Sequence, residues 1–182
     1  MSRNLPGHTS PTVGFEAPLA MLSACHGRIE QQCATLRRLV THVAVHGTDA
    51  AAREAAAGVM RYFDSAAVNH HADEERDLFP ALMEAMAGSD AVCLRELTAG
   101  LAAEHRQLEA HWRRVRDALA ALAAGAAASL VVDDVEALVS LYEQHIAREE
   151  AELLPMAARL LGDGELDRVG RSMRARRGIA EV

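Results

Sequence analysis

Apolar residues recur every three or four positions along four long stretches of the chain. In the third stretch, for example, apolar residues recur at intervals of seven residues: Leu94, Leu101, Leu108, Val115 and Leu122. This spacing places apolar side chains on one face of an α-helix and is typical of helices that pack around a shared core. It predicts four long helices at about residues 18–46, 49–87, 91–124 and 133–161.

Glycine-rich breaks separate these stretches. Gly47 ends the first helix, residues 88–90 separate the second from the third, and Gly125 ends the third. Thr48 is the expected N-cap of the second helix, and Asp133 or Asp134 that of the fourth. Long helices joined by short connections predict an all-α fold, an antiparallel up-down-up-down four-helix bundle.

Three parts are expected along the chain. Residues 1–14, rich in proline and glycine, predict a flexible N-terminal arm, and residues 15–162 form the bundle. Residues 163–182 contain a short basic helix, at about 165–176, that packs on the bundle or trails from it. Its arginines are expected to form a solvated face, with a partner-docking patch as the alternative.

Each long helix carries one histidine on its apolar face: His26, His70, His105 and His145. In an antiparallel bundle, two residues lie at one level when they are equally far from the turn between them. His105 and His145 each lie 20 residues from Gly125, and similar counts hold at the other turns to within about one helical turn. The four histidines should therefore share one layer of the bundle.

A doubled motif surrounds two of these histidines. The sequence HHADEERDLFP, from residue 70, recurs as HIAREEAELLP from residue 145. A glutamate four residues after a histidine lies beside it on the same helix face. Composition alone would give on the order of one such pair, whereas the chain has five: His26/Glu30, His70/Glu74, His71/Glu75, His105/Glu109 and His145/Glu149.

Buried imidazoles and carboxylates at one level would be costly unless they bind something. Mixed imidazole and carboxylate ligands, with no cysteine cluster, favour iron or manganese over structural zinc. No histidine has a glutamate three residues before it, which disfavours a ferritin-like site. Because Ile146 occupies the position of His71 in the second copy, His71 and Glu75 are expected to point outward or to support the ligands from behind.

At these motifs the chain resembles the hemerythrin-like (HHE cation-binding) family, over about residues 16–161. The resemblance implies two non-haem iron ions with an oxo or hydroxo bridge, with manganese or zinc as alternatives. It implies that the terminal ligands are His26, His70, His105 and His145, and that the bridging carboxylates are Glu74 and Glu149. Oxygen-carrying members have a second histidine where this chain has Glu109. Either Glu109 binds the second ion or that ion is held less fully, whereas Glu30 is expected to be a surface carboxylate.

Composition narrows the choice of partners. The net charge of −7 argues against nucleic acid and membrane surfaces, and no apolar run is long enough to cross a membrane. With no signal peptide and three unpaired cysteines, expected to be buried thiols, the protein is predicted to be cytoplasmic.

Two functions remain open. The first is a protein that handles or senses O₂, NO or iron at the metal site, in which case a sensor would need an unidentified protein partner. The second is a di-iron redox enzyme acting on peroxide, NO or Fe(II).

Overall fold

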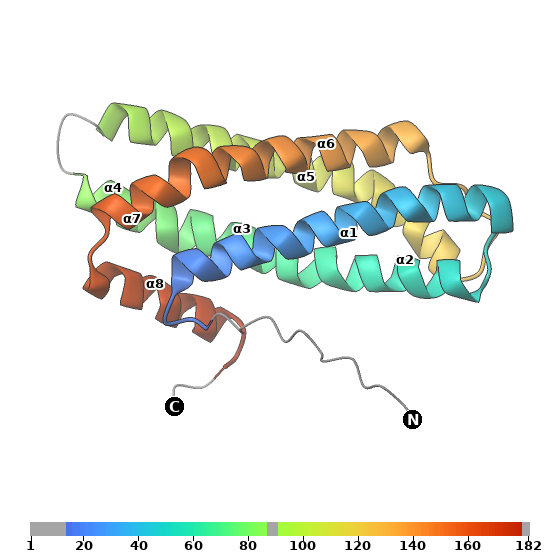
Figure 1. Ribbon diagram of the computed structural model, residues 1–182, viewed down its shortest axis with the longest axis horizontal. Coiled ribbons are helices and arrows are strands. Elements are labelled where there is room, and N and C mark those ends of the chain that lie inside the picture. Colours follow the sequence, from blue (N-terminus) through green and yellow to red (C-terminus); the bar gives the residue numbers. More distant parts are fainter. Residues whose placement is uncertain (1–13, 87–90, 180–182) are drawn as a thin grey trace, which may run out of the picture.

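The computed structural model describes residues 14–86 and 91–179, and this part of the chain contains helices and connecting turns but no strands. Long helical rods lie side by side along the length of the molecule (Figure 1). The bounds along the rods are α1 Pro18–His46; α2 Ala50–Tyr62, η1 Phe63–Ala67, α3 Val68–Asp73, η2 Glu74–Leu78 and α4 Phe79–Ala85; α5 Ala91–Ala123; α6 Val132–Arg148, η3 Glu149–Leu153 and α7 Leu154–Leu160. A shorter helix, α8 Asp163–Arg176, follows. The all-α prediction is confirmed.

The core has two apolar clusters. α1 packs against α2 and α6, and α5 packs against the same two helices. One cluster lies toward the turns at Gly47 and Gly125 and includes Ile29, Phe63 and Leu119; the other lies toward the opposite end and includes Leu82 and Met173. The seam histidines fall between the two clusters along every rod, so apolar packing holds a polar layer on both sides.

Some helix ends differ from the sequence-based expectations. The N-cap of α2 is Asp49, whose carboxylate accepts a hydrogen bond from the Ala52 amide at 2.8 Å, and Thr48 instead donates to the carbonyl of Ala126. The fourth rod begins at Val132, so Asp133 and Asp134 lie in its first turn, where acidic side chains suit the helix dipole. The break expected at residues 88–90 lies outside the described residues, as do residues 1–13 of the arm predicted at residues 1–14.

The basic helix α8 packs against α1, α3 and η2 near one end of the rods (Figure 1). Arg176 and Arg177 both form ion pairs with the fully buried carboxylate of Asp73, the residue before Glu74. These two arginines are only 17% and 16% exposed, so the expectation that they belong to a solvated face is wrong. Burial of the Asp73 carboxylate requires paired charges beside it.

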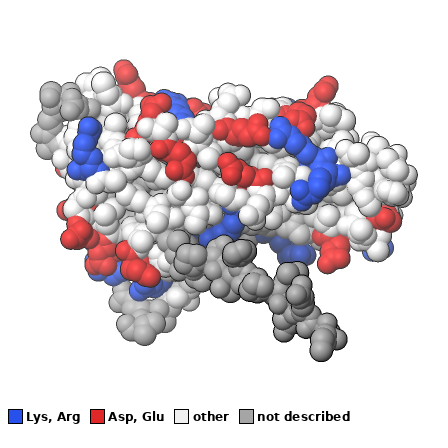
Figure 2. Space-filling view, viewed as in Figure 1, with Lys and Arg blue, Asp and Glu red and all other residues white. Residues whose placement is uncertain are grey.

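Charges on the outer surface are mixed. Figure 2 shows acidic side chains spread over one face with basic side chains beside several of them. Arg37 of α1, for example, pairs with Glu136 and Glu143 of α6. Within the described residues, no helix combines the length and the apolar character that crossing a membrane requires. Cys25 and Cys33 are buried as expected, but Cys93 is exposed, which corrects that prediction.

Candidate metal centre

The six predicted ligand residues lie together in the layer between the two apolar clusters. Every one of them is at most 2% exposed. They form two overlapping groups, each with ligand atoms within 4.8 Å of one another: His26, His70, Glu74 and Glu149 in the first, His105, His145, Glu74 and Glu149 in the second. Glu74 and Glu149 belong to both groups, which is the arrangement that two carboxylates bridging a pair of ions require.

The nitrogen and oxygen atoms face one another at short distances. Nε2 of His26 lies 3.1 Å from Glu149, and Nε2 of His145 lies 2.9 Å from the same carboxylate. Glu74 lies 3.4 Å from Nε2 of His70 and 3.3 Å from Nε2 of His105. The Nε2 atoms of His105 and His145 are 3.0 Å apart. Two nitrogens that bind one ion at right angles, each about 2.1 Å from it, are separated by about the same distance.

A π-helical turn begins at each of the two shared glutamates. In η2 the amide of Phe79 donates to the carbonyl of Glu74, and in η3 the amide of Leu154 donates to that of Glu149. Both bonds span five residues and so widen the helix locally, a feature that recurs at functional sites. Proline follows each turn at the same offset, where its missing N–H breaks the regular α-helical pattern. The doubled motif therefore encodes a doubled backbone shape.

Outer carboxylates orient three of the four histidines. The Nδ1 atoms of His26, His105 and His145 lie 2.6, 2.7 and 2.7 Å from Glu150, Glu75 and Glu104. When Nδ1–H donates to a carboxylate, Nε2 is left free to bind a metal, and the ring cannot turn away.

Two of these three outer carboxylates explain the glutamate doublets of the motif. In each doublet the first glutamate enters the shared centre, and the second reaches the Nδ1 of a histidine on a neighbouring rod: Glu75 reaches His105 and Glu150 reaches His26. The supporting role expected for Glu75 agrees with this contact. Glu104 and Glu150 were not foreseen, although the doublet itself was a signal for Glu150.

Burial and the facing carboxylates shift the pKa values of the residues at the centre. Burial alone would lower the pKa of His26 and His105, but their contacts with the carboxylate of Glu149 raise these pKa values to about 9 and about 10. Burial and the charge of Glu149 raise the pKa of Glu74. Burial alone would raise the pKa of Glu149, but the contacts of three imidazoles with its carboxylate outweigh burial and lower this pKa.

The donor set fits divalent cations. Eight buried side-chain atoms in the described part have no hydrogen-bond partner of normal geometry, and seven of them belong to the two groups: Nε2 of His26, both ring nitrogens of His70 and all four carboxylate oxygens of Glu74 and Glu149. Unpaired buried polar atoms are rare in folded proteins because each one costs free energy. Cations binding at this layer would satisfy Nε2 of His26, one ring nitrogen of His70 and the four carboxylate oxygens together.

The remaining candidate residues divide between the centre and the surface. Glu30 is exposed, as expected. Glu109 is 47% exposed and faces Arg113 at 3.7 Å, and it belongs to neither group. His71 is buried at 8% exposure, and its ring stacks on that of His105 with the centroids 4.0 Å apart. The alternative in which His71 points outward is therefore wrong.

Comparison with known proteins identifies the family. Residues 17–157 match the model of the hemerythrin HHE cation-binding domain. The chain therefore belongs to this family, as its motifs indicated. A protein of Haemophilus influenzae (strain ATCC 51907 / DSM 11121 / KW20 / Rd), described as an uncharacterized protein, is 30% identical over 167 residues, which are 92% of this chain and 94% of that relative.

Proposed function

We propose that this protein binds two non-haem iron ions and uses them to handle or sense O₂, NO or iron. One ion would be held by His26 and His70 and the other by His105 and His145, with Glu74 and Glu149 shared between them. The sharing of these two buried carboxylates by both groups is the observation that carries the proposal. Iron bound by imidazole and carboxylate with open positions supplies redox chemistry and binding of small ligands.

The chain's own residues prepare the centre for this task. Glu150, Glu75 and Glu104 hold three imidazoles with Nε2 facing inward. The apolar clusters on either side restrict water, which strengthens the charge interactions inside the layer. We also infer that the four rods form the up-down-up-down antiparallel bundle, since α1 and α5 each pack between α2 and α6. Free Cys25 and Cys33 support a reducing, cytoplasmic location.

A di-iron redox enzyme is the second candidate. A cavity of about 240 Å³ lies beside the centre, and its lining includes Phe63, Trp112, Tyr142 and His71. This volume would admit a small substrate such as peroxide.

The two functions differ in what happens after the small molecule binds. Protein reconstituted with Fe(II) under anaerobic conditions would be exposed to O₂, NO and peroxide while its absorption spectrum is followed. A spectrum that changes on adding O₂ or NO and returns when the gas is removed supports binding or sensing. Sustained consumption of peroxide or NO supports the enzyme. An iron-loaded protein that reacts with none of the three would contradict the enzyme and the binding of O₂ or NO, and would leave iron itself as the species handled.

A further inference from the structure

Three closely paired charges lie just outside the metal centre and have no part in the ligand set proposed above. The carboxylate of Asp73 is fully buried, and Arg176 and Arg177, at the end of α8, both pair with it. α8 lies beyond residues 17–157, the part of the chain that matches the family model. Apolar side chains of similar volume often stabilise a core as well as a buried ion pair does, so these charges require an explanation.

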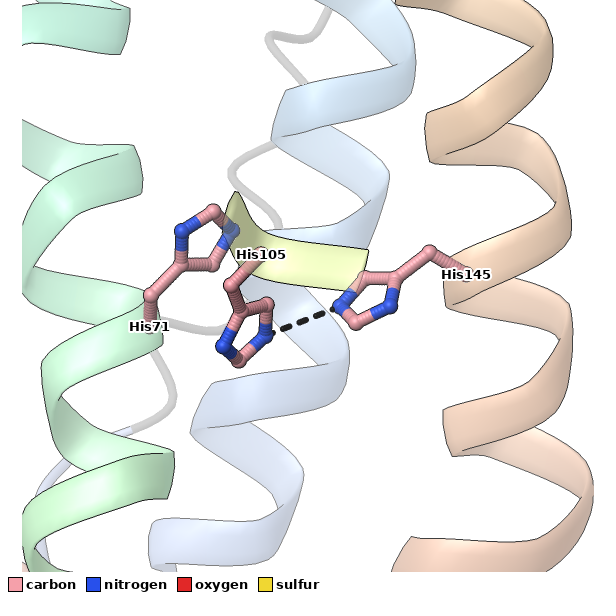
Figure 3. A group of neighbouring side chains, drawn as sticks. All are labelled: His71, His105 and His145. Atoms are coloured by element: carbon pink, nitrogen blue, oxygen red, sulfur yellow. Dashed lines mark hydrogen bonds between the residues drawn. The ribbon is translucent and has the colours of Figure 1, made fainter. Parts of the chain in front are cut away.

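Asp73 lies at the point where the backbone leaves α3 for the π-helical turn η2. α3 has only six residues and is bounded by η1 on one side and η2 on the other. It carries His70 on its inner side, and Figure 3 shows His71 of the same helix facing histidines of two other rods. Glu74, one of the two shared carboxylates, follows Asp73 directly. A shift of the backbone at Asp73 would therefore move Glu74 as well.

The two arginines hold this turn at two points. Arg177 donates to both carboxylate oxygens of Asp73, at 2.6 and 3.1 Å. Arg176 donates to Asp73 through one guanidinium nitrogen and to Asp77 of η2 through another, the latter at 2.5 Å. One guanidinium group thus spans the widened turn that begins at Glu74, which restricts movement of the backbone there.

α8 is itself firmly packed, so it can serve as a support. Met173 is fully buried in the apolar cluster at this end of the rods, and Val169 is 3% exposed. The guanidinium group of Arg177 lies over the ring of Phe15, 5.6 Å from its centroid. Arg177 is therefore held between an aromatic ring on one side and the carboxylate of Asp73 on the other.

The second copy of the motif has a comparable support from a different helix. Arg148 occupies the position of Asp73, directly before the shared carboxylate of Glu149. It donates to Glu104 of α5 at 2.7 Å. The residue before each shared glutamate is thus tied to a neighbouring helix by an ion pair. For Glu149 this helix is one of the four rods, whereas for Glu74 it is α8.

We propose that Arg176 and Arg177 are positioning residues of the metal centre, because they hold η2 and with it the shared carboxylate of Glu74 in place. This inference rests on the proposed two-metal function. The charge of the arginines allows a test by sign. A positive charge near the centre repels cations, so the loss of this charge alone would strengthen metal binding. The loss of positioning would weaken it for both ions together, since Glu74 belongs to both ligand groups.

Arg177→Gln tests this sign, because Arg176 still pairs with Asp73 and the buried carboxylate keeps a partner. Wild-type protein, Arg177→Gln, Arg177→Lys and Arg171→Gln, a control at an exposed site of the same helix, would be titrated with Co(II) against a chelator. We expect Arg177→Gln to bind both ions about tenfold more weakly, the lower end of the loss that follows removal of a residue supporting a metal ligand. Arg177→Lys keeps the charge but not the paired geometry, so its loss should be smaller. Arg171→Gln should bind as the wild type does.

Asp49→Ala, which removes the N-cap of α2 at the far end of the rods, controls for overall stability and should leave metal affinity unchanged. Equal or tighter binding of both ions by Arg177→Gln overturns the inference, as does an equally large loss of affinity in Asp49→Ala. If Arg177→Gln fails to fold, Arg177→Lys decides, and wild-type affinity in that variant overturns the inference. Wild-type protein that binds no Co(II) would instead contradict the proposed function itself.

Discussion

The outer carboxylate Glu75 offers a quantitative test of how the centre is built. Its carboxylate lies 2.7 Å from Nδ1 of His105 and accepts two further hydrogen bonds from Arg106, each 2.7 Å long. Glu75→Ala removes the group that keeps the His105 ring turned toward the centre. Arg106 is 55% exposed, so water replaces its lost partner at little cost. The effect should therefore appear in metal affinity more than in stability.

The size of the effect follows from this contact. Removal of a carboxylate behind a metal-binding histidine typically costs about 10–100-fold in affinity, which is about 1.4–2.7 kcal/mol. Glu75→Gln keeps an oxygen that accepts the Nδ1–H bond but loses the negative charge, so its loss should be smaller. Glu109→Ala, on the same helix as His105 but facing outward, should leave affinity unchanged.

Anaerobic competition between each variant and a chromophoric chelator for Fe(II) would measure these affinities, with thermal melts of the metal-free proteins run in parallel. The predicted order of affinity is wild type and Glu109→Ala together, then Glu75→Gln, then Glu75→Ala. Wild-type affinity in Glu75→Ala would refute the orienting role of this carboxylate. A comparable loss in Glu109→Ala would show that Glu109 reaches the metal after all.

Three further predictions concern protons, packing and capping. The raised pKa values of His26 and His105, about 9 and about 10, keep both imidazoles protonated at neutral pH, so a binding metal must displace these protons. The apparent affinity for metal should therefore fall by at least about tenfold per pH unit between pH 8 and pH 6. A metal affinity that does not depend on pH would contradict this prediction. Gly170→Ala should destabilise the fold by about 1–3 kcal/mol, which corresponds to about 2–4 °C in melting temperature per kcal/mol, because the added Cβ would clash with the carbonyl oxygen of Phe15. Gly164→Ala, with open space around it, should cause no loss, and equal melting of the two variants would refute close packing of α8. Asp49→Ala should lower the free energy of unfolding, measured by chemical denaturation, by about 1 kcal/mol, and Thr48→Ala should lower it clearly less. The reverse order would indicate that Thr48 is the N-cap.

The sequence predicted the helices and the histidine layer well because both depend on simple periodicity. Apolar spacing marked each rod, and counting residues to Gly125 placed His105 opposite His145, whose Nε2 atoms are 3.0 Å apart. The outer carboxylates were harder to foresee, since they act between helices. Nothing in the sequence sets Glu104 apart from an ordinary exposed helix glutamate except that it precedes His105. Its contact with Nδ1 of His145 depends on how α5 and α6 are rotated toward each other.

The misjudged position of His71 has a physical lesson. Ile146, its counterpart in the second motif, suggested that this position does not belong to the ligand face. Yet Ile146 is itself 6% exposed and packs in the core, so an apolar counterpart indicated burial. The helix widens into η2 and η3 directly after these positions, which changes how neighbouring residues face the core. A uniform helical wheel does not describe such a segment.

Iron stoichiometry tests the central claim most directly. Metal-free protein would be loaded with Fe(II) under anaerobic conditions, freed of loosely bound metal by gel filtration and analysed for iron per chain. Two ions per chain are predicted for the wild type, close to one for His26→Ala, and close to none for Glu149→Ala, because Glu149 belongs to both ligand groups. A wild-type protein that retains no iron, or a Glu149→Ala variant that keeps two ions, would contradict a two-metal centre with shared carboxylates.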